Sequence, residues 1–304
     1  MAIEALDHAL HLLESLAGAD PDAIEEGVHE VRKRTKEVRG LARMLRPALG
    51  HRYRRFNTLV GDAATELSSI RDAHVVLDTF EHLREAAHRP NDPKLDRIGR
   101  QQARLARHAT RSIQRGDVRI HRAHALLGKA RRRVLRWEID GGFEALAGGL
   151  ETTYRRGRRG LRRARNENSD DSVHQWRKAV KHLWYEVRLL EESAPSVLSP
   201  LVGRLDELAE SLGNDHDLAV LIERVVADPD RFGTGGGVKR TVKLARRRQQ
   251  DLRAHSFRLG ATIYAESPGA FNRRMAAYWA ATTELGPEPP VHPTPPIPTG
   301  TDPT

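Results

Sequence analysis

The stretch that decides the fold of this chain occurs twice. It first reads Val28-His29-Glu30-Val31-Arg32-Lys33-Arg34-Thr35-Lys36, and it recurs 145 positions later as Val173-His174-Gln175-Trp176-Arg177-Lys178-Ala179-Val180-Lys181. Both copies share the pattern H-x-x-R-K-x-x-K, and seven residues after its last lysine stand Arg43 and Arg188. Spacings of three, four and seven residues fall on one face of an α-helix, which turns by about 100° per residue. The stretch therefore predicts two helices, each with a histidine-led cationic stripe.

The opposite face of each predicted helix is apolar. On a helical wheel it carries Val31 and Val38 in the first copy and Trp176 and Val180 in the second, while Tyr185 falls on the polar side. An amphipathic helix packs its apolar face into a core. The cationic faces are then available to a long, repetitive anion. The alternative is a solvated basic face that is paired with acids of a neighbouring helix.

Two further pairs of blocks extend the repeat. Residues 67–75 resemble residues 210–218, with Asp72 matching Asp215, and residues 100–108 resemble residues 239–247. Matched blocks in the same order predict an internal duplication. Its period is far longer than that of solenoid repeats, so two packed helical bundles fit better.

The prolines outline the architecture. Eight of the 16 lie in the last eighteen residues, which predicts a disordered tail at 286–304. The others, Pro200 among them, are expected between helices, where proline starts or stops them. Strand-like alternation is scarce, so the chain is predicted to be all-α, as one domain over 1–285 with halves at 1–138 and 139–285. The expected helices run over 3–17, 22–47, 51–88, 94–116, 118–138, 142–166, 171–194, 198–227, 237–266 and 269–284.

The charge balance points to a polyanionic partner. The 304 residues include 51 Lys and Arg against 41 Asp and Glu, a net charge of +10. This excess favours nucleic acid, an anionic membrane surface or polyphosphate, although a protein from an arginine-rich proteome would also show it. The chain has no cysteine, which excludes disulfides and thiolate metal sites. Neither a secretory signal nor an apolar run of about 20 residues is visible, so a cytoplasmic protein is expected.

Three other predicted helices add cations. Residues 154–165 contain seven arginines in twelve positions. The cations expected to lie on one face of their own helix, and so to extend the basic surface, are Arg100 and Arg104, Lys239 and Lys243, and Arg155, Arg159 and Arg162.

These features resemble the CHAD family, the conserved histidine α-helical domain. The resemblance rests on the paired H-x-x-R-K-x-x-K helices, on Arg71-Asp72 and on Tyr154-x-x-Gly157-Arg158, and it extends to about residue 285. It implies two antiparallel four-helix bundles related by pseudo-twofold symmetry, with a basic central groove or pore that binds inorganic polyphosphate at bacterial polyphosphate granules. Asn214 stands where the first half has Arg71, which departs from the pattern.

The resemblance places the two motifs at that groove, with Asp72 and Asp215 orienting the motif cations. Arginine binds two phosphate oxygens at once, lysine acts as a point charge, and histidine donates a hydrogen bond or gains a charge beside an anion. With the added cations, the candidate polyphosphate-binding residues are His29, Arg32, Lys33, Lys36, Arg43, Arg100, Arg104, Arg155, Arg159, Arg162, His174, Arg177, Lys178, Lys181, Arg188, Lys239 and Lys243.

Other functions remain as alternatives. Nucleic acid is the main rival, since basic helices bind any phosphate backbone, but aromatic residues for base stacking make up only 5% of the chain. A scaffold for acidic proteins is a third class. Metal binding is disfavoured because the motif histidines lie among cations and no H-E-x-x-H pattern occurs. No P-loop, G-x-S-x-G motif or cofactor signature is present, so neither an enzyme nor a cofactor is expected.

Overall fold

The computed structural model describes residues 1–16, 19–86, 92–113, 118–139, 141–229 and 235–286. Within these ranges the protein is built from helices and no strand occurs, so the predicted all-α class is confirmed. The proline-rich tail from residue 287 onward lies outside the described residues.

The first part of the chain forms seven helices in the described ranges. They are α1 (Ala2–Ser15), α2 (Pro21–Met44), α3 (Arg46–Leu49), α4 (His51–Glu66), α5 (Ser68–Ala86), α6 (Pro93–Ile113) and α7 (Val118–Val134). The second part continues with α8 (Glu144–Glu167), α9 (Asp170–Leu190), the 3₁₀ turn η1 (Glu191–Ser193), α10 (Pro195–Ala227), α12 (Gly235–Ile263) and α13 (Pro268–Leu285).

Two predicted boundaries are wrong. The single helix expected over 51–88 is interrupted at Leu67, whose side chain is buried and whose backbone leaves regular helix geometry, and Ser68 donates a hydrogen bond to the Thr65 carbonyl at 2.9 Å. Pro200 lies inside α10 and not between helices. Proline disrupts a helix least when the carbonyl that it frees can reach water, and Pro200 is exposed near the start of α10.

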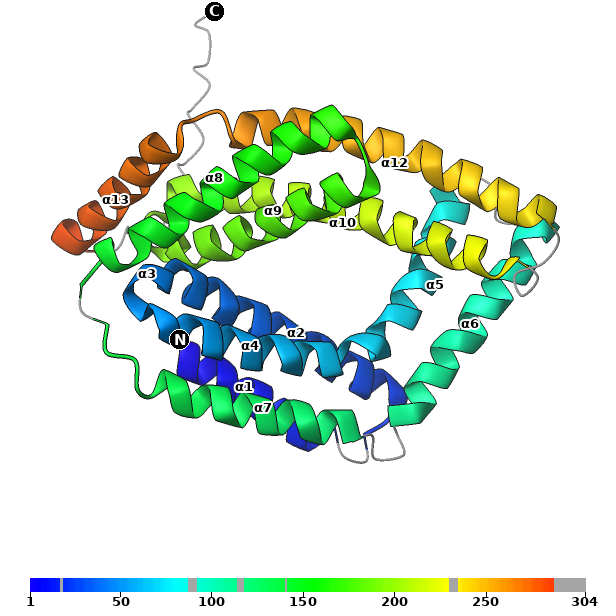
Figure 1. Cartoon of the computed structure of the whole chain (residues 1–304), viewed down its shortest axis with the longest axis horizontal. Helices are drawn as coiled ribbons and strands as arrows, with labels where there is room; N and C mark the ends of the chain where they lie inside the picture. The colour runs from blue at the N-terminus through cyan, green and yellow to red at the C-terminus, as the bar shows by residue number, and fades with distance from the viewer. Residues whose placement is uncertain (17–18, 87–91, 114–117, 140, 230–234, 287–304) are drawn as a thin grey trace, which may run out of the picture.

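Three apolar cores hold the helices together. The first joins α1, α2, α4 and α7 around Phe56 and Leu127. The second joins α8, α9, the beginning of α10, the end of α12 and α13 around Trp176 and Phe271. In the third, the α5–α6 pair packs through Phe80 against the end of α10 and the beginning of α12. Figure 1 shows this pair at one end of the molecule, between the other two groups.

The motif helices α2 and α9 are neighbours between the first two cores (Figure 1). Their predicted apolar faces are confirmed, because Val31, Val38, Trp176 and Val180 are all buried. The assignment of Tyr185 to the polar side is wrong. Its side chain is buried where α9 crosses α2, and a Cβ atom added to Gly40 would lie 3.0 Å from the Tyr185 Cβ. A residue without a side chain at this position lets the two helices approach closely.

Candidate anion-binding site

Cations of both motif helices meet at His182 of α9. Burial lowers the pKa of His182 to about 3, and further lowering comes from the nearby charges of Arg43, Arg39, Arg156 and Lys178. Arg39 and Arg43 belong to α2, Arg156 to α8 and Lys178 to α9. We call these five residues the cationic seam. His182 is therefore neutral at physiological pH and can offer a hydrogen bond without adding to the repulsion.

The seam is supported from behind by a buried carboxyl group. Glu186 is fully buried on α9 and accepts a hydrogen bond from the Thr153 hydroxyl at 2.9 Å. Burial raises its pKa well above the usual range, although Arg43 and Arg156 oppose the shift. Arg43, only 8% exposed, is the main cation that opposes this shift, so burial and the charge of Arg43 act on the Glu186 pKa in opposite directions.

The first motif divides between structural and accessible positions. Arg32 donates a hydrogen bond to the Ala64 carbonyl at 2.8 Å, near the end of α4, where the helix dipole is negative. Lys33 lies 3.5 Å from a Glu30 carboxylate oxygen. Lys36 is half-buried and His29 is exposed. Arg32 thus fastens α2 to α4, a role that the sequence pattern did not reveal.

The second motif is more deeply seated. The His174 ring stacks on His216 at 4.4 Å between centroids. Burial lowers the pKa of His174 to about 4, and His216, Lys178 and Arg177 lower it further. Burial also lowers the pKa of Arg177, while Asp217 raises it. His174 is therefore neutral above about pH 4. Of the two motif lysines, Lys178 is exposed and Lys181 is half-buried.

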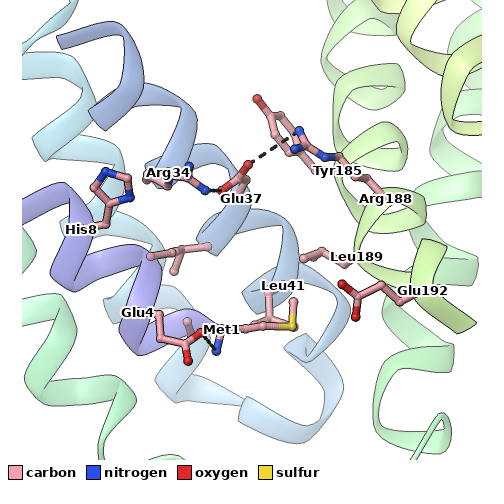
Figure 2. Close-up of a pocket in the computed structure, with 13 residues that line it drawn as sticks. Met1, Glu4, His8, Arg34, Glu37, Leu41, Tyr185, Arg188, Leu189 and Glu192 are labelled. Atoms are coloured by element: carbon pink, nitrogen blue, oxygen red, sulfur yellow. Dashed lines mark hydrogen bonds and ion pairs between the residues drawn. The ribbon is translucent and has the colours of Figure 1, made fainter. Parts of the chain in front are cut away.

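Arg43 and Arg188 hold the same position in the two motifs but lie in different surroundings. Arg188 is 3.7 Å from Glu37 and has its guanidinium over the Trp184 ring, 5.5 Å from the centroid. With Glu37, Arg34 and Tyr185 it lines a cavity of about 390 Å³ beside α1. Figure 2 shows acidic and basic groups interleaved there. This cavity suits an anion poorly, so Arg188 does not share the seam.

The remaining candidates are distributed over the surface. Arg155 forms an ion pair with Glu151 one turn away, and its neighbour Arg156 is the α8 residue in the seam. The exposed candidates outside the seam are Arg100, Arg104, Arg159, Arg162, Lys239 and Lys243. Within the described part of the chain, no hydrogen bond or ion pair joins these side chains to the seam. Arg39, Arg156 and His182 were missed by the motif, although His182 follows His174 by two helical turns.

The expected role of Asp215 is wrong. Its carboxylate accepts a hydrogen bond at 2.7 Å from Arg253 of α12, which is not a motif cation. Arg253 also donates to the Asn168 carbonyl at 2.8 Å and pairs with Asp170. This network fastens α12 to α10 and to the beginning of α9. The side chains of Arg71 and Asp72 lie outside the described ones.

The fold and the seam place the chain in the class of all-helical proteins that have a basic site between two amphipathic helices. The family model of the CHAD domain matches residues 1–226, so the chain belongs to the CHAD family. The match ends within the last turn of α10, and the extension of the domain to residue 285 stays a prediction. No curated protein matches the chain. In the described ranges no helix is long and apolar enough to cross a membrane, and no three potential metal ligands lie together.

Proposed function

We propose that this CHAD-domain protein binds inorganic polyphosphate along the cationic seam and the neighbouring motif positions. The observation that carries the proposal is the convergence of cations from α2, α8 and α9 on His182. Polyphosphate carries a negative charge on every internal phosphate and has no bases to be read. A row of guanidinium and ammonium groups with a neutral histidine donor matches such a chain.

The predicted two-half architecture fits this role. In the proposal, the first core and α5–α6 belong to the half at 1–138, and the second core to the half at 139–285. Each half supplies one motif helix to a shared basic groove. The crossing of α2 and α9 at Gly40 and Tyr185 supports this arrangement, because Arg39 and Arg43 of α2 then lie close enough to His182 of α9 for their charges to lower its pKa.

The residues divide by the part that they play in the proposal. The seam and the accessible motif lysines contact phosphate, while Arg32 and Arg177 chiefly hold the helices in place. Arg100, Arg104, Lys239 and Lys243 extend the basic surface for longer chains. We propose a binding protein and not an enzyme, located at polyphosphate granules in the cytoplasm.

The site is less suited to nucleic acid than to polyphosphate. Binding of single strands uses aromatic side chains on which bases stack. The aromatic rings of α9 are not available for this, since Trp176 and Tyr185 are buried and Trp184 is partly covered with Arg188 over its ring. Weak binding through phosphates alone is the expected extent of any interaction with RNA or DNA.

A pair of charge-matched variants tests the proposal. Lys33→Gln/Lys178→Gln removes one accessible cation from each motif helix, whereas Arg122→Gln/Arg132→Gln removes two exposed cations from α7. Both lower the net charge equally. The affinity for long-chain polyphosphate is measured by titration calorimetry at several salt concentrations. The motif variant should bind less tightly, and the slope of log affinity against log salt should fall by up to about 1.4 if each lost contact contributes ~0.7.

The control variant should keep the wild-type slope and affinity. Equal losses in the two variants would show that only net charge matters, which contradicts a localised site. Circular dichroism verifies that helicity is retained. Tighter binding of single-stranded RNA than of polyphosphate at matched phosphate concentration would favour the nucleic-acid alternative.

A further inference from the structure

A cavity at one end of the seam is lined by cations that the motif does not include. It lies where the end of α2, the short helix α3, the beginning of α4 and the first half of α8 meet, and its volume is about 670 Å³. Arg43 and Arg156 of the seam line it, and Arg46, His51 and Arg54 are added from α3 and α4. We call it the α3 pocket. It contains four guanidinium groups, and no carboxylate is among its lining residues.

The guanidinium groups of the α3 pocket have few partners. Arg43 is nine-tenths buried, yet it forms no hydrogen bond or ion pair with any residue in the described part of the chain. Arg54 and Arg156 likewise form no hydrogen bond or ion pair with a carboxylate of the described residues, and Arg46 covers the Tyr53 ring at 5.4 Å. A buried cation without a partner is costly unless an anion joins it. Glu186 is the acid whose charge acts on Arg43 and Arg156, so four guanidinium groups of the pocket have one buried carboxyl group beside them, and an anion in the pocket would supply further negative charge.

The beginning of α4 adds backbone donors to the same pocket. Gly50 and His51, which begin this 16-residue helix, line the cavity. No side chain caps the helix, and its first turn contains no acidic residue. Its first amide groups have no carbonyl partner within the helix, and the helix dipole makes this end positive. Gly50 has φ of 51°, a left-handed conformation that leaves the turn open at the point where a ligand would approach.

We infer that the α3 pocket binds a compact phosphoanion, either a free phosphate species or the terminal phosphate of a polyphosphate chain that lies in the seam. Guanidinium groups and helix N-termini both favour tetrahedral, multiply charged oxyanions. The shared residues Arg43 and Arg156 make the pocket continuous with the seam. The inference deepens the proposed function and rests on it only where the ligand is a chain end.

The test uses two short anions and three variants of the whole chain. Orthophosphate and tripolyphosphate are titrated calorimetrically into the wild-type protein, Arg46→Gln/Arg54→Gln, Lys33→Gln/Lys178→Gln and Arg122→Gln/Arg132→Gln. Arg46 and Arg54 are exposed and lie outside the seam, so their replacement leaves the cores intact. The pocket variant should lose at least about tenfold in tripolyphosphate affinity, because two charge-assisted contacts are removed. The α7 variant should stay within about twofold of the wild type, and the motif variant should lose less affinity than the pocket variant, since both keep the Arg46 and Arg54 contacts.

The outcomes separate the two sources of the ligand. Orthophosphate that binds the wild type and is lost in the pocket variant identifies a free-ion site. Binding of tripolyphosphate alone, with displacement by long chains, identifies a site for chain ends. Unchanged tripolyphosphate affinity in the pocket variant, an equal loss in the motif variant, or no binding of either short anion to the wild type would overturn the inference.

The same titrations distinguish this inference from the proposed function. If tripolyphosphate binds the pocket but long-chain polyphosphate fails to bind the wild type, the pocket stands and the proposed function fails. If long chains bind through Lys33 and Lys178 while the pocket variant behaves as the wild type, the proposed function stands and the pocket assignment fails.

Discussion

Glu186 gives a direct test of the electrostatics behind the seam. Its carboxyl group is fully buried beside Arg43 and Arg156, and burial raises its pKa well above 4.5, the ordinary value that it regains in the unfolded chain. Between the two pKa values the folded protein keeps a proton that the unfolded chain has lost. Folding therefore becomes less favourable as the pH rises through this window, by up to ~1.4 kcal/mol per pH unit.

Replacement of Glu186 by Gln removes this pH dependence. The amide has the shape of the protonated carboxyl group, and its oxygen can still accept the hydrogen bond from Thr153. At about pH 4.5 the difference in unfolding free energy between variant and wild type reports only the cost of the new amide group. As the pH rises above this value, the variant should gain stability relative to the wild type with a slope of up to ~1.4 kcal/mol per unit, until the pH passes the folded-state pKa of Glu186.

The measurement is urea denaturation followed by circular dichroism at a series of pH values. Glu284→Gln, an exposed change on α13, serves as the control and should leave the pH profile unchanged. A variant that loses stability relative to the wild type as the pH rises would refute the reasoning. It would show that Glu186 is ionised in the folded protein and that its pairing with Arg43 outweighs its desolvation.

Two further changes should affect stability alone, measured as unfolding free energies in urea. Arg253→Met leaves the carboxylate of Asp215 buried without its 2.7 Å donor and should cost about 3–5 kcal/mol, whereas Arg258→Met, exposed on the same helix, should be nearly neutral. A loss below about 1 kcal/mol for Arg253→Met would mean that Asp215 finds another partner. Gly149→Ala places a Cβ atom against the Met44 carbonyl and should cost about 1–3 kcal/mol, while Gly203→Ala meets nothing within 4 Å and should stabilise α10 by up to about 1 kcal/mol. Equal effects of the two alanines would contradict the close packing of α8 on α2.

The repeated motif predicted the helical class, the family and the buried faces of α2 and α9. These follow from local periodicity, since Val31, Val38, Trp176 and Val180 lie on one side of their helices whatever the rest of the chain does. The boundaries of the helices were harder to predict from the sequence. The interruption at Leu67 depends on how that side chain is buried in the first core, and no glycine or proline marks it in the sequence.

The site depends on contacts between helices that are distant in the sequence, and the periodicity of the sequence does not predict such contacts. Arg32 and Arg43 share the polar side of α2, but one reaches the end of α4 and the other the seam. Arg155 and Arg156 are adjacent, and the packing of α8 decides that the charge of Arg156 acts on His182 while Arg155 pairs with Glu151. The equivalent positions of Arg43 and Arg188 in the repeat did not predict the different surroundings of Arg188, because Glu37, Trp184 and α1 lie around it.

The sharing of α10 between two cores has a consequence for the newly synthesised chain. The apolar side of the α5–α6 pair, with Phe80 and Ile98, is covered by Leu221 of α10 and Val238 of α12. The ribosome makes those residues more than a hundred positions later. At roughly 5–20 residues per second, the apolar side of the pair stays exposed for about 6–30 seconds. The apolar side of this pair, at residues 76–86 and 95–98, is therefore a surface that a chaperone acting during translation would cover until α10 and α12 are made.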